Sequence, residues 1–206
     1  MTRSEVAAGQ YLAIPFSYNP DRQAVNETLL AGCLHLPNLC PIPCTETERQ
    51  IAVASWLTDP NSLFWEAWHR GSIVGIMGLT RIIPRLDAMA HMAFFDRQLV
   101  GRRNLILKMM RWSFENLELQ RLTIEVPEHL EPLIRFCRAK LGFRYEGEDL
   151  AKDHPIAKAV PRNSAAATTQ WIVKVGSRRE RAHWSDDGWH DLARLRILRE
   201  EFKLDQ

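Results

Sequence analysis

The stretch from Asn104 to Leu117 is apolar around most of a helical circumference. Its charged residues form one narrow stripe at steps of three and four: Lys108, Arg111, Glu115 and Glu118. The remaining surface is covered by Leu105, Ile106, Met109, Met110, Trp112 and Phe114. This pattern predicts a helix with one narrow side in water. Such a helix must lie against a sheet.

The residues after this helix predict two strands and another helix. From Arg121 to Val126, apolar and polar residues alternate, as they do along a strand with one buried face. Apolar residues at helical spacing from Leu130 to Leu141 predict a helix that stops at Gly142, which suits a left-handed cap. Phe143 to Gly147 then begins another strand.

The preceding residues predict further strands and two helices. A helix follows the Asn19-Pro20 cap, and a second begins at the Thr45 to Glu48 capping box. Gly71 suits a tight hairpin between two of the strands. The expected strands are Tyr11 to Ser17, Leu63 to Trp68, Ile73 to Thr80 and Ala88 to Phe95. This order of elements predicts a mixed α/β or α+β domain.

The C-terminal part gives a weaker pattern. Ala151 to Thr169 is rich in Pro and Ala and predicts a loop, whereas Gln170 to Val175 looks like a strand. Leu192 to Leu198 alternates like a strand, although its leucines also fit a helix.

Length and charge limit the classes of function. The 206 residues and 46% hydrophobic content predict one domain, 1–206, with a real core. With a formal net charge of +2, no overall field draws the chain to nucleic acid or membrane. No signal-like or membrane-spanning run of apolar residues is visible, so we expect a cytoplasmic protein.

Two local clusters suggest other functions. Cys33, His35, Cys40 and Cys44 invite a zinc interpretation, but the paired C-x-x-C spacing is missing, which favours free thiols and no metal. Arginines and tryptophans near the C-terminus could bind nucleic acid, but the balanced charge favours a solvated cluster. These residues are Trp171, Arg178, Arg179, Arg181 and Trp184.

The segment from Phe94 to Gly147 resembles the core of the GCN5-related N-acetyltransferases. It has a strand, the loop Gln98-Leu-Val-Gly101-Arg102-Arg103, a long helix, a strand, and a helix ending in Lys140-Leu-Gly-Phe143. The resemblance implies a twisted mixed sheet of six to seven strands flanked by about four helices. It also implies transfer of an acetyl group from acetyl-CoA to a primary amine of a small molecule or protein.

The end of the chain resembles the closing strand of relatives that acetylate ribosomal proteins, other protein N-termini or small amines. This likeness rests on Asp187-Gly-Trp-His-Asp191 and the residues after it. It favours a strand at Leu192 to Leu198 and makes Ala151 to His183 an insertion before the last strand. The acceptor and the oligomeric state stay open, with a homodimer as one possibility.

The loop before the long helix suits a pyrophosphate. Successive amides from Val100 to Asn104 lie at a helix N-terminus, and Arg102 and Arg103 can add charge-assisted hydrogen bonds. The resemblance adds Phe94, Phe95, Gln98, Leu99 and Gly101 to the cofactor site. The family pattern has a small residue at the place of Arg103, so a bulky side chain there could crowd the phosphates.

Acetyl transfer needs a neutral amine and therefore a group that accepts a proton. The resemblance points to a carboxylate on the strand before the phosphate loop, where Asp87 stands, with His91 four residues later on the same face. An ordinary His pKa of ~6.5 makes His91 the better base at pH 7. Glu125, on the polar face of its strand, is a third candidate.

The residue four positions before Gly142 differs from the one that the resemblance leads us to expect. Many family members have a tyrosine four residues before the glycine at the place of Gly142, where it protonates the leaving thiolate, but this chain has Arg138. An arginine can stabilise negative charge on sulfur but is a poor proton donor. The neighbouring Cys137 has core spacing. The departures at Arg103 and Arg138 leave a non-catalytic binding module as the alternative.

Overall fold

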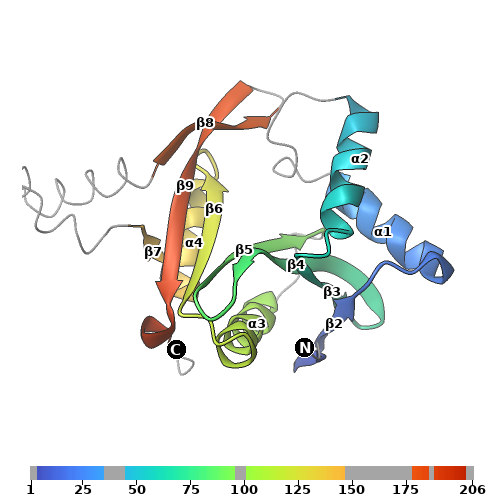
Figure 1. Cartoon of the computed structure of the whole chain (residues 1–206), viewed down its shortest axis with the longest axis horizontal. Coiled ribbons are helices and arrows are strands. Elements are labelled where there is room, and N and C mark those ends of the chain that lie inside the picture. The colour runs from blue at the N-terminus through green and yellow to red at the C-terminus, as the bar shows by residue number, and fades with distance from the viewer. Residues whose placement is uncertain (1–3, 35–44, 96–100, 147–177, 186–187, 203–206) are drawn as a thin grey trace, which may run out of the picture.

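The structure is a computed structural model, and it describes residues 4–34, 45–95, 101–146, 178–185 and 188–202. Across these ranges the chain forms one nine-stranded sheet and four α-helices (Figure 1). The elements are β1 (Val6–Ala8), β2 (Tyr11–Phe16), η1 (Pro20–Arg22), α1 (Gln23–Leu34), α2 (Glu46–Leu57), β3 (Leu63–His69), β4 (Ser72–Ile83), β5 (Asp87–Phe94), α3 (Arg102–Asn116), β6 (Arg121–Pro127), α4 (Glu131–Leu141), β7 (Arg144–Tyr145), β8 (Arg178–Ser185), β9 (Gly188–Leu198) and η2 (Arg199–Glu201).

The predicted mixed class is confirmed, but the predicted strand number of six to seven was too low. Strands β1 and β8 were not predicted: β1 has only three residues and is held by pairing with β2, and the many charges of β8 hide any alternation. Leu192 to Leu198 is part of strand β9, as predicted. The possible strand at Gln170 to Val175 lies outside the described residues.

The strand order is β1-β2-β3-β4-β5-β6-β9-β7, and β8 also pairs with β9. Neighbouring strands are antiparallel except for β5 and β6, which are parallel. A parallel pair needs a crossover connection, and α3 supplies it. The C-terminal strand β9 therefore lies inside the sheet, between β6 and β7.

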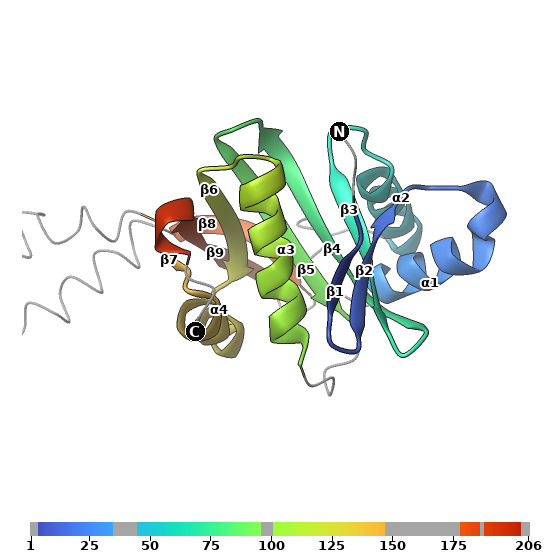
Figure 2. The same ribbon diagram turned by 90° about the horizontal axis from the view of Figure 1, so that it is seen from below.

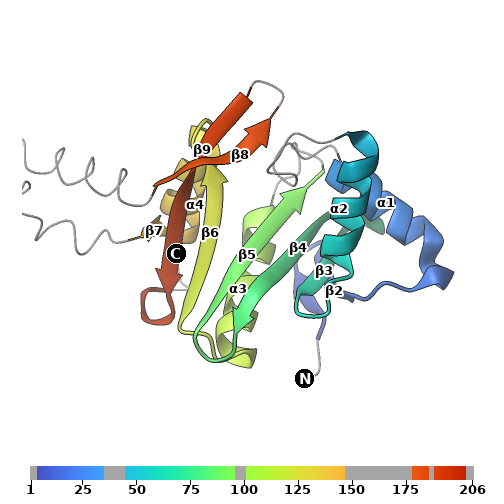
Figure 3. The same ribbon diagram turned by 45° about the horizontal axis from the view of Figure 1, so that its top comes forward.

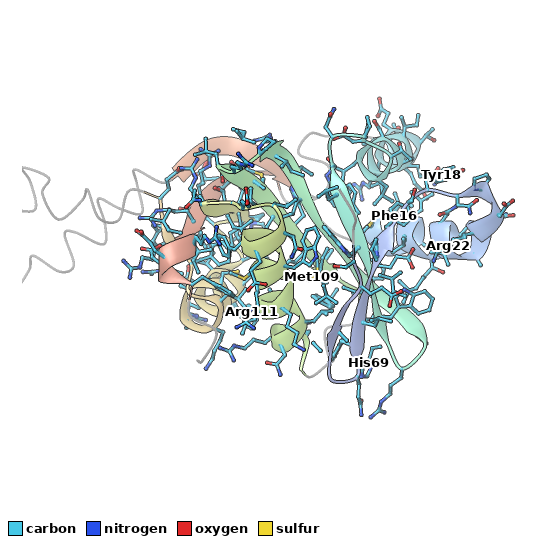
Figure 4. All side chains as sticks on the ribbon, turned by 60° about the horizontal axis from the view of Figure 1, so that its bottom comes forward. Phe16, Tyr18, Arg22, His69, Met109 and Arg111 are labelled. Carbon is cyan, nitrogen blue, oxygen red and sulfur yellow. The ribbon has the colours of Figure 1, made fainter. Side chains whose placement is uncertain are left out.

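Helices α3 and α4 cover one face of the sheet, and α1 and α2 cover part of the other (Figures 1 and 2). The predicted wide apolar surface of α3 is confirmed: Met109 points toward the sheet, whereas Arg111 lies on the exposed side (Figure 4). The smaller core under α1 and α2 consists of Phe16, Leu29, Cys33, Val53, Leu57, Phe64 and Ile76.

An ion pair with a buried carboxylate fastens η1, just before α1, to the sheet. The side chain of Glu66, in β3, is fully buried, and Arg22 of η1 donates two hydrogen bonds to its carboxylate, at 2.6 and 2.8 Å. Trp68 donates a third from its indole nitrogen at 2.9 Å. A buried charge of this kind is tolerated only when its hydrogen bonds are made.

Strands β7 and β8 continue one another along β9. Tyr145 pairs with Leu195, the amide of Glu146 donates to the carbonyl of Arg194, and Arg178 pairs with Ala193. Positions 146 and 178 are thus opposite successive residues of β9. The predicted insertion at Ala151 to His183 overlaps β8 at its end, and the rest of it lies outside the described residues.

Candidate active site

Strands β5 and β6 pair over only three positions and then separate. The pairs are Asp87 with Arg121, Ala88 with Leu122 and Met89 with Thr123. Beyond them, β6 is paired with β9 and β5 with β4, within the described parts of the chain. Figure 3 shows the two strands diverging. The sheet is therefore split between two parallel strands near its middle.

The split leaves an edge of β5 available for a ligand. The amide of Phe95 donates to Val74 of β4 at 2.9 Å. Because backbone groups alternate in direction along a strand, those of Met92 and Phe94 point away from β4, toward the split. On the α3 side, a small cavity of about 30 Å³ adjoins this edge; its lining includes Ala90, Met92, Ile106, Met109, Leu122 and Phe143.

His91 lies on the opposite face of β5, the face of α1 and α2. Its Nε2 is 2.7 Å from the hydroxyl oxygen of Thr80, and the edge of its ring meets Trp56 of α2 with centroids 5.3 Å apart. Burial lowers the pKa of His91 to about 4; the positive charge of Arg81 adds to this effect, and Glu125 opposes it. The imidazole is therefore neutral at pH 7.

Glu125 lies on β6 on the same face as His91, across the split. The shared face follows from the alternation of side chains, because Thr123, two residues earlier, donates to Asp87, four residues before His91. The Glu125 side chain is 11% exposed, and its Oε1 is 3.5 Å from Nε of Arg194. The structure thus brings two of the predicted catalytic residues to the two sides of the opening.

Asp87 has a different environment. Arg121 donates to its carboxylate at 2.6 Å and Thr123 at 3.2 Å, where β5 and β6 are still paired. Arg121 also reaches Glu146 at 3.5 Å, and Glu146 lies 3.3 Å from Arg194. Asp87 is therefore one end of an ionic network that crosses β6 and β9.

The guanidinium carbon of Arg138 lies 4.6 Å from the ring centroid of Tyr145. Arg138 is on α4 and Tyr145 on β7, whose pairing with Leu195 places the tyrosine on the α4 side of the sheet. A cation over an aromatic face is a stabilising contact. Arg138, which stands where many family members have a tyrosine, is thus packed against Tyr145 of the neighbouring strand.

The start of α3 is described, but most of the predicted phosphate loop is not. Gln98, Leu99 and Val100 lie outside the described residues. Gly101 caps α3 with φ +89°, a left-handed conformation that glycine adopts without strain, and the amide of Asn104 donates to its carbonyl. These features fit a tight turn entering a helix.

The two arginines of this turn point to different neighbours. The guanidinium carbon of Arg102 lies 5.8 Å from the Phe94 ring centroid, beside the split edge of β5. Nε of Arg103 donates to the carbonyl of Lys140 at 2.9 Å, in the last turn of α4.

On the other side of β5, α1 approaches so closely that a Cβ on Gly32 would lie 2.4 Å from the Phe95 ring.

The cysteines in the described residues are core residues. Cys33 and Cys137 are buried, and burial raises the pKa of each thiol to about 12. His35, Cys40 and Cys44 lie outside the described residues, so the zinc interpretation is not tested there. The core position predicted for Cys137 is confirmed.

Two residues at the opening were not singled out from the sequence as site residues. Thr80 bonds to His91, and Arg81 influences its pKa. Neither belongs to a recognisable motif, and only the pairing of β4 with β5 brings them to His91. Trp56 was recognised only as a core residue of its helix.

Together, the split parallel pair, the crossover helix with its glycine cap and the strand order define the fold of the GCN5-related acetyltransferases. No protein-family model and no curated protein sequence matches the chain. Among solved structures, a GNAT-family acetyltransferase from Bacillus anthracis aligns with a TM-score of 0.61 and 12% identity, over 96% of this chain and 100% of that one. Spermidine N-acetyltransferase from Vibrio cholerae, in complex with CoA and spermine, aligns with a TM-score of 0.62 and 13% identity, over 94% of this chain and 98% of that one.

Across the described residues, no helix combines the length and apolar character needed to cross a membrane.

Proposed function

We propose that this protein is an N-acetyltransferase that moves an acetyl group from acetyl-CoA to a primary amine. The observation that carries the proposal is the split between β5 and β6, with a free strand edge inside it and His91 and Glu125 on its two sides. Structural neighbours with this fold are acetyltransferases, and one of them is a complex with CoA.

The open edge of β5 suits the amide-containing arm of CoA. Backbone groups of Met92 and Phe94 face the split, and an extended ligand with its own amides can pair with them as an added strand would. The amides after Gly101 suit the pyrophosphate, because a helix N-terminus offers unpaired N–H groups and a partial positive charge. Arg102 supplies a full charge beside them, and the Arg103 bond to Lys140 directs that side chain toward α4.

His91 is the base that we favour. The attacking amine gives up one proton and the departing sulfur takes up one, so the site must accept a proton on the acceptor side of the sheet. At pH 7 the imidazole is neutral and can accept a proton, and the contact with Thr80 holds its ring, although a pKa of about 4 makes it a weaker base than an ordinary histidine. Glu125, across the opening, can hold the incoming ammonium group through its negative charge and is the alternative base. Asp87 is engaged by Arg121 and Thr123, and we assign it a structural role.

Binding of the acetyl donor is tested by calorimetry with acetyl-CoA. We expect micromolar affinity, and we expect Arg102→Gln to weaken it about tenfold, the cost of one charge-assisted hydrogen bond. Arg111→Gln is the matched control, because Arg111 is on the exposed side of the same helix. Absence of binding at millimolar acetyl-CoA would contradict the proposal.

Turnover is tested by following thiol release with a panel of amines. His91→Gln should lower kcat about 10² to 10⁴-fold while donor affinity is kept, because a general base contributes by this amount. If His91→Gln and Glu125→Gln both turn over normally, the base lies elsewhere. If no amine supports thiol release although acetyl-CoA binds, the fold serves as the non-catalytic binding module.

The narrower resemblance to enzymes that act on ribosomal proteins or other protein N-termini remains a hypothesis. The neighbour from Vibrio cholerae is a spermidine acetyltransferase, so both protein and small-molecule amines belong in the panel.

A further inference from the structure

The arginines on the open face of β6 and β9 are each paired with a carboxylate. Arg121 binds Asp87 at 2.6 Å, and Arg196 binds Glu201 at 2.7 Å. Arg194 lies 3.3 Å from Glu146. Their charges are therefore largely neutralised before any ligand arrives.

Arg81 of β4 differs from these arginines. It is exposed, and it makes no ion pair with a carboxylate of the described ranges, 4–34, 45–95, 101–146, 178–185 and 188–202. Its backbone has φ +49°, in the left-handed region that residues with a side chain rarely adopt. A bulky residue is kept there at a conformational cost.

The unusual backbone belongs to a β-bulge beside the candidate base. The register of β4 against β5 shifts between Thr80 and Ile83, so β4 has one extra residue there. Thr80 faces His91, and Ile82 packs against the core on the other side of the sheet, which leaves Arg81 as the residue turned by the bulge. Bulges of this kind re-aim side chains and often lie next to active sites.

The charge of Arg81 acts on His91, whose strand borders the opening. Arg81 follows Thr80, whose hydroxyl bonds to His91, and within the described residues its charge and that of Glu125 act on the His91 ring. An acceptor amine placed between His91 and Glu125 would therefore have close by a cation that no carboxylate of the described residues pairs with. A second ammonium group on the acceptor would be repelled there, whereas an anionic group would be attracted.

We propose that Arg81 binds an anionic group of the acceptor, so that the substrate is an amine that also carries a carboxylate or a phosphate. This inference rests on the proposed acetyltransferase function and narrows its substrate class. The planar guanidinium matches either oxyanion through two parallel hydrogen bonds. A free polyamine such as spermidine lacks this group.

The test compares matched acceptors with the full chain and saturating acetyl-CoA. The acceptors are a dipeptide with a free C-terminal carboxylate, the same dipeptide as its C-terminal amide, phosphoethanolamine, ethanolamine and spermidine. We expect at least about a tenfold higher kcat/KM for the anionic member of a pair, mainly through KM. The pair with the larger ratio tells whether the group is a carboxylate or a phosphate.

Variants separate the charge of Arg81 from its role in folding. Arg81→Asn should abolish the preference, so that kcat/KM for the anionic and the neutral member of each pair becomes nearly equal, because Asn tolerates a left-handed backbone but carries no charge. Arg81→Lys should keep part of the preference. Arg85→Asn is the matched control, since Arg85 is also exposed, has φ +61°, and pairs with Glu118 instead. A preference that survives Arg81→Asn, or wild-type preference for neutral amines or spermidine, overturns the proposal.

A second measurement does not depend on turnover. The His91 imidazole pKa, followed by NMR, should rise in Arg81→Asn, because a positive neighbour is removed. It should also rise when an anionic acceptor binds wild-type protein and neutralises Arg81, and not when the neutral partner is added. Loss of turnover with every acceptor would overturn the acetyltransferase function, whereas absence of this acceptor-dependent shift would overturn the role of Arg81.

Discussion

The two halves of one sheet face are built differently. Over β2, β3 and β4, helices α1 and α2 cover an apolar cluster and the buried Arg22–Glu66 pair. Over β6 and β9, no helix of the described residues covers the same face, and the side chains form the ionic network from Asp87 to Arg194. His91 lies at the boundary, touched by Trp56 from the covered half.

The comparison separates stability from function. In the covered half the carboxylate of Glu66 is fully withdrawn from water, so removal of its partner lowers the free energy of unfolding. In the bare half the paired carboxylates keep some contact with water, with Asp87 17% and Glu146 32% exposed, so these ion pairs contribute less to stability and can be exchanged for contacts with a ligand. We therefore expect mutations of charged residues in the covered half to lower the free energy of unfolding, and those in the bare half to change ligand binding more than stability.

The largest effect on stability is expected from Arg22→Met. This change leaves Glu66 buried without its cation and should lower the free energy of unfolding by about 3 to 5 kcal/mol. Urea denaturation measures it. Arg111→Met, which removes an exposed pair with Glu115, is the control and should cost less than about 1 kcal/mol. If the two variants lose the same free energy of unfolding, the buried Glu66 carboxylate does not make its ion pair more important for stability than an exposed pair.

The next effect concerns pH and the boundary residue His91. Below pH 6.5 the unfolded imidazole binds a proton, whereas the folded one stays neutral until about pH 4. Folding then excludes a proton, so stability should fall as the pH drops from 6.5 to 4, by up to roughly 3 kcal/mol. Unfolding of His91→Gln over the same range should lack this component. Parallel curves for the two proteins would mean that His91 titrates normally.

The smallest effect is expected from deleting 147–177, which tests our hypothesis that this segment is an insertion into a single strand. Joining Glu146 to Arg178 keeps every pair with β9, so the free energy of unfolding should stay within about 1 kcal/mol of the full chain or rise. Deleting 147–178 instead shifts the register of β8 against β9 by one residue, which disturbs the sheet pairing. If both deletions behave alike, positions 146 and 178 are not neighbours along one strand.

Much of the fold follows from local patterns in the sequence. The capping box at Thr45 and Glu48 begins α2 as predicted, and Gly142, with φ +82°, ends α4. The surroundings of the candidate site could be predicted less well. His91 and Glu125 were recognised individually as candidates, but nothing in the sequence indicated that Asp87 is engaged by Arg121 and Thr123.

The sequence by itself determined the helices, most strands and the resemblance to an acetyltransferase core, because periodicity and capping act between residues a few positions apart. Only the tertiary structure decided where β5 leaves β6, which charged side chains act on His91, and that Arg22 pairs with the buried Glu66. These features depend on pairs such as Thr80 with His91 and Arg22 with Glu66, which are 11 and 44 residues apart. Contacts over such separations arise when strands and helices pack, and a single sequence carries no periodic signal for them.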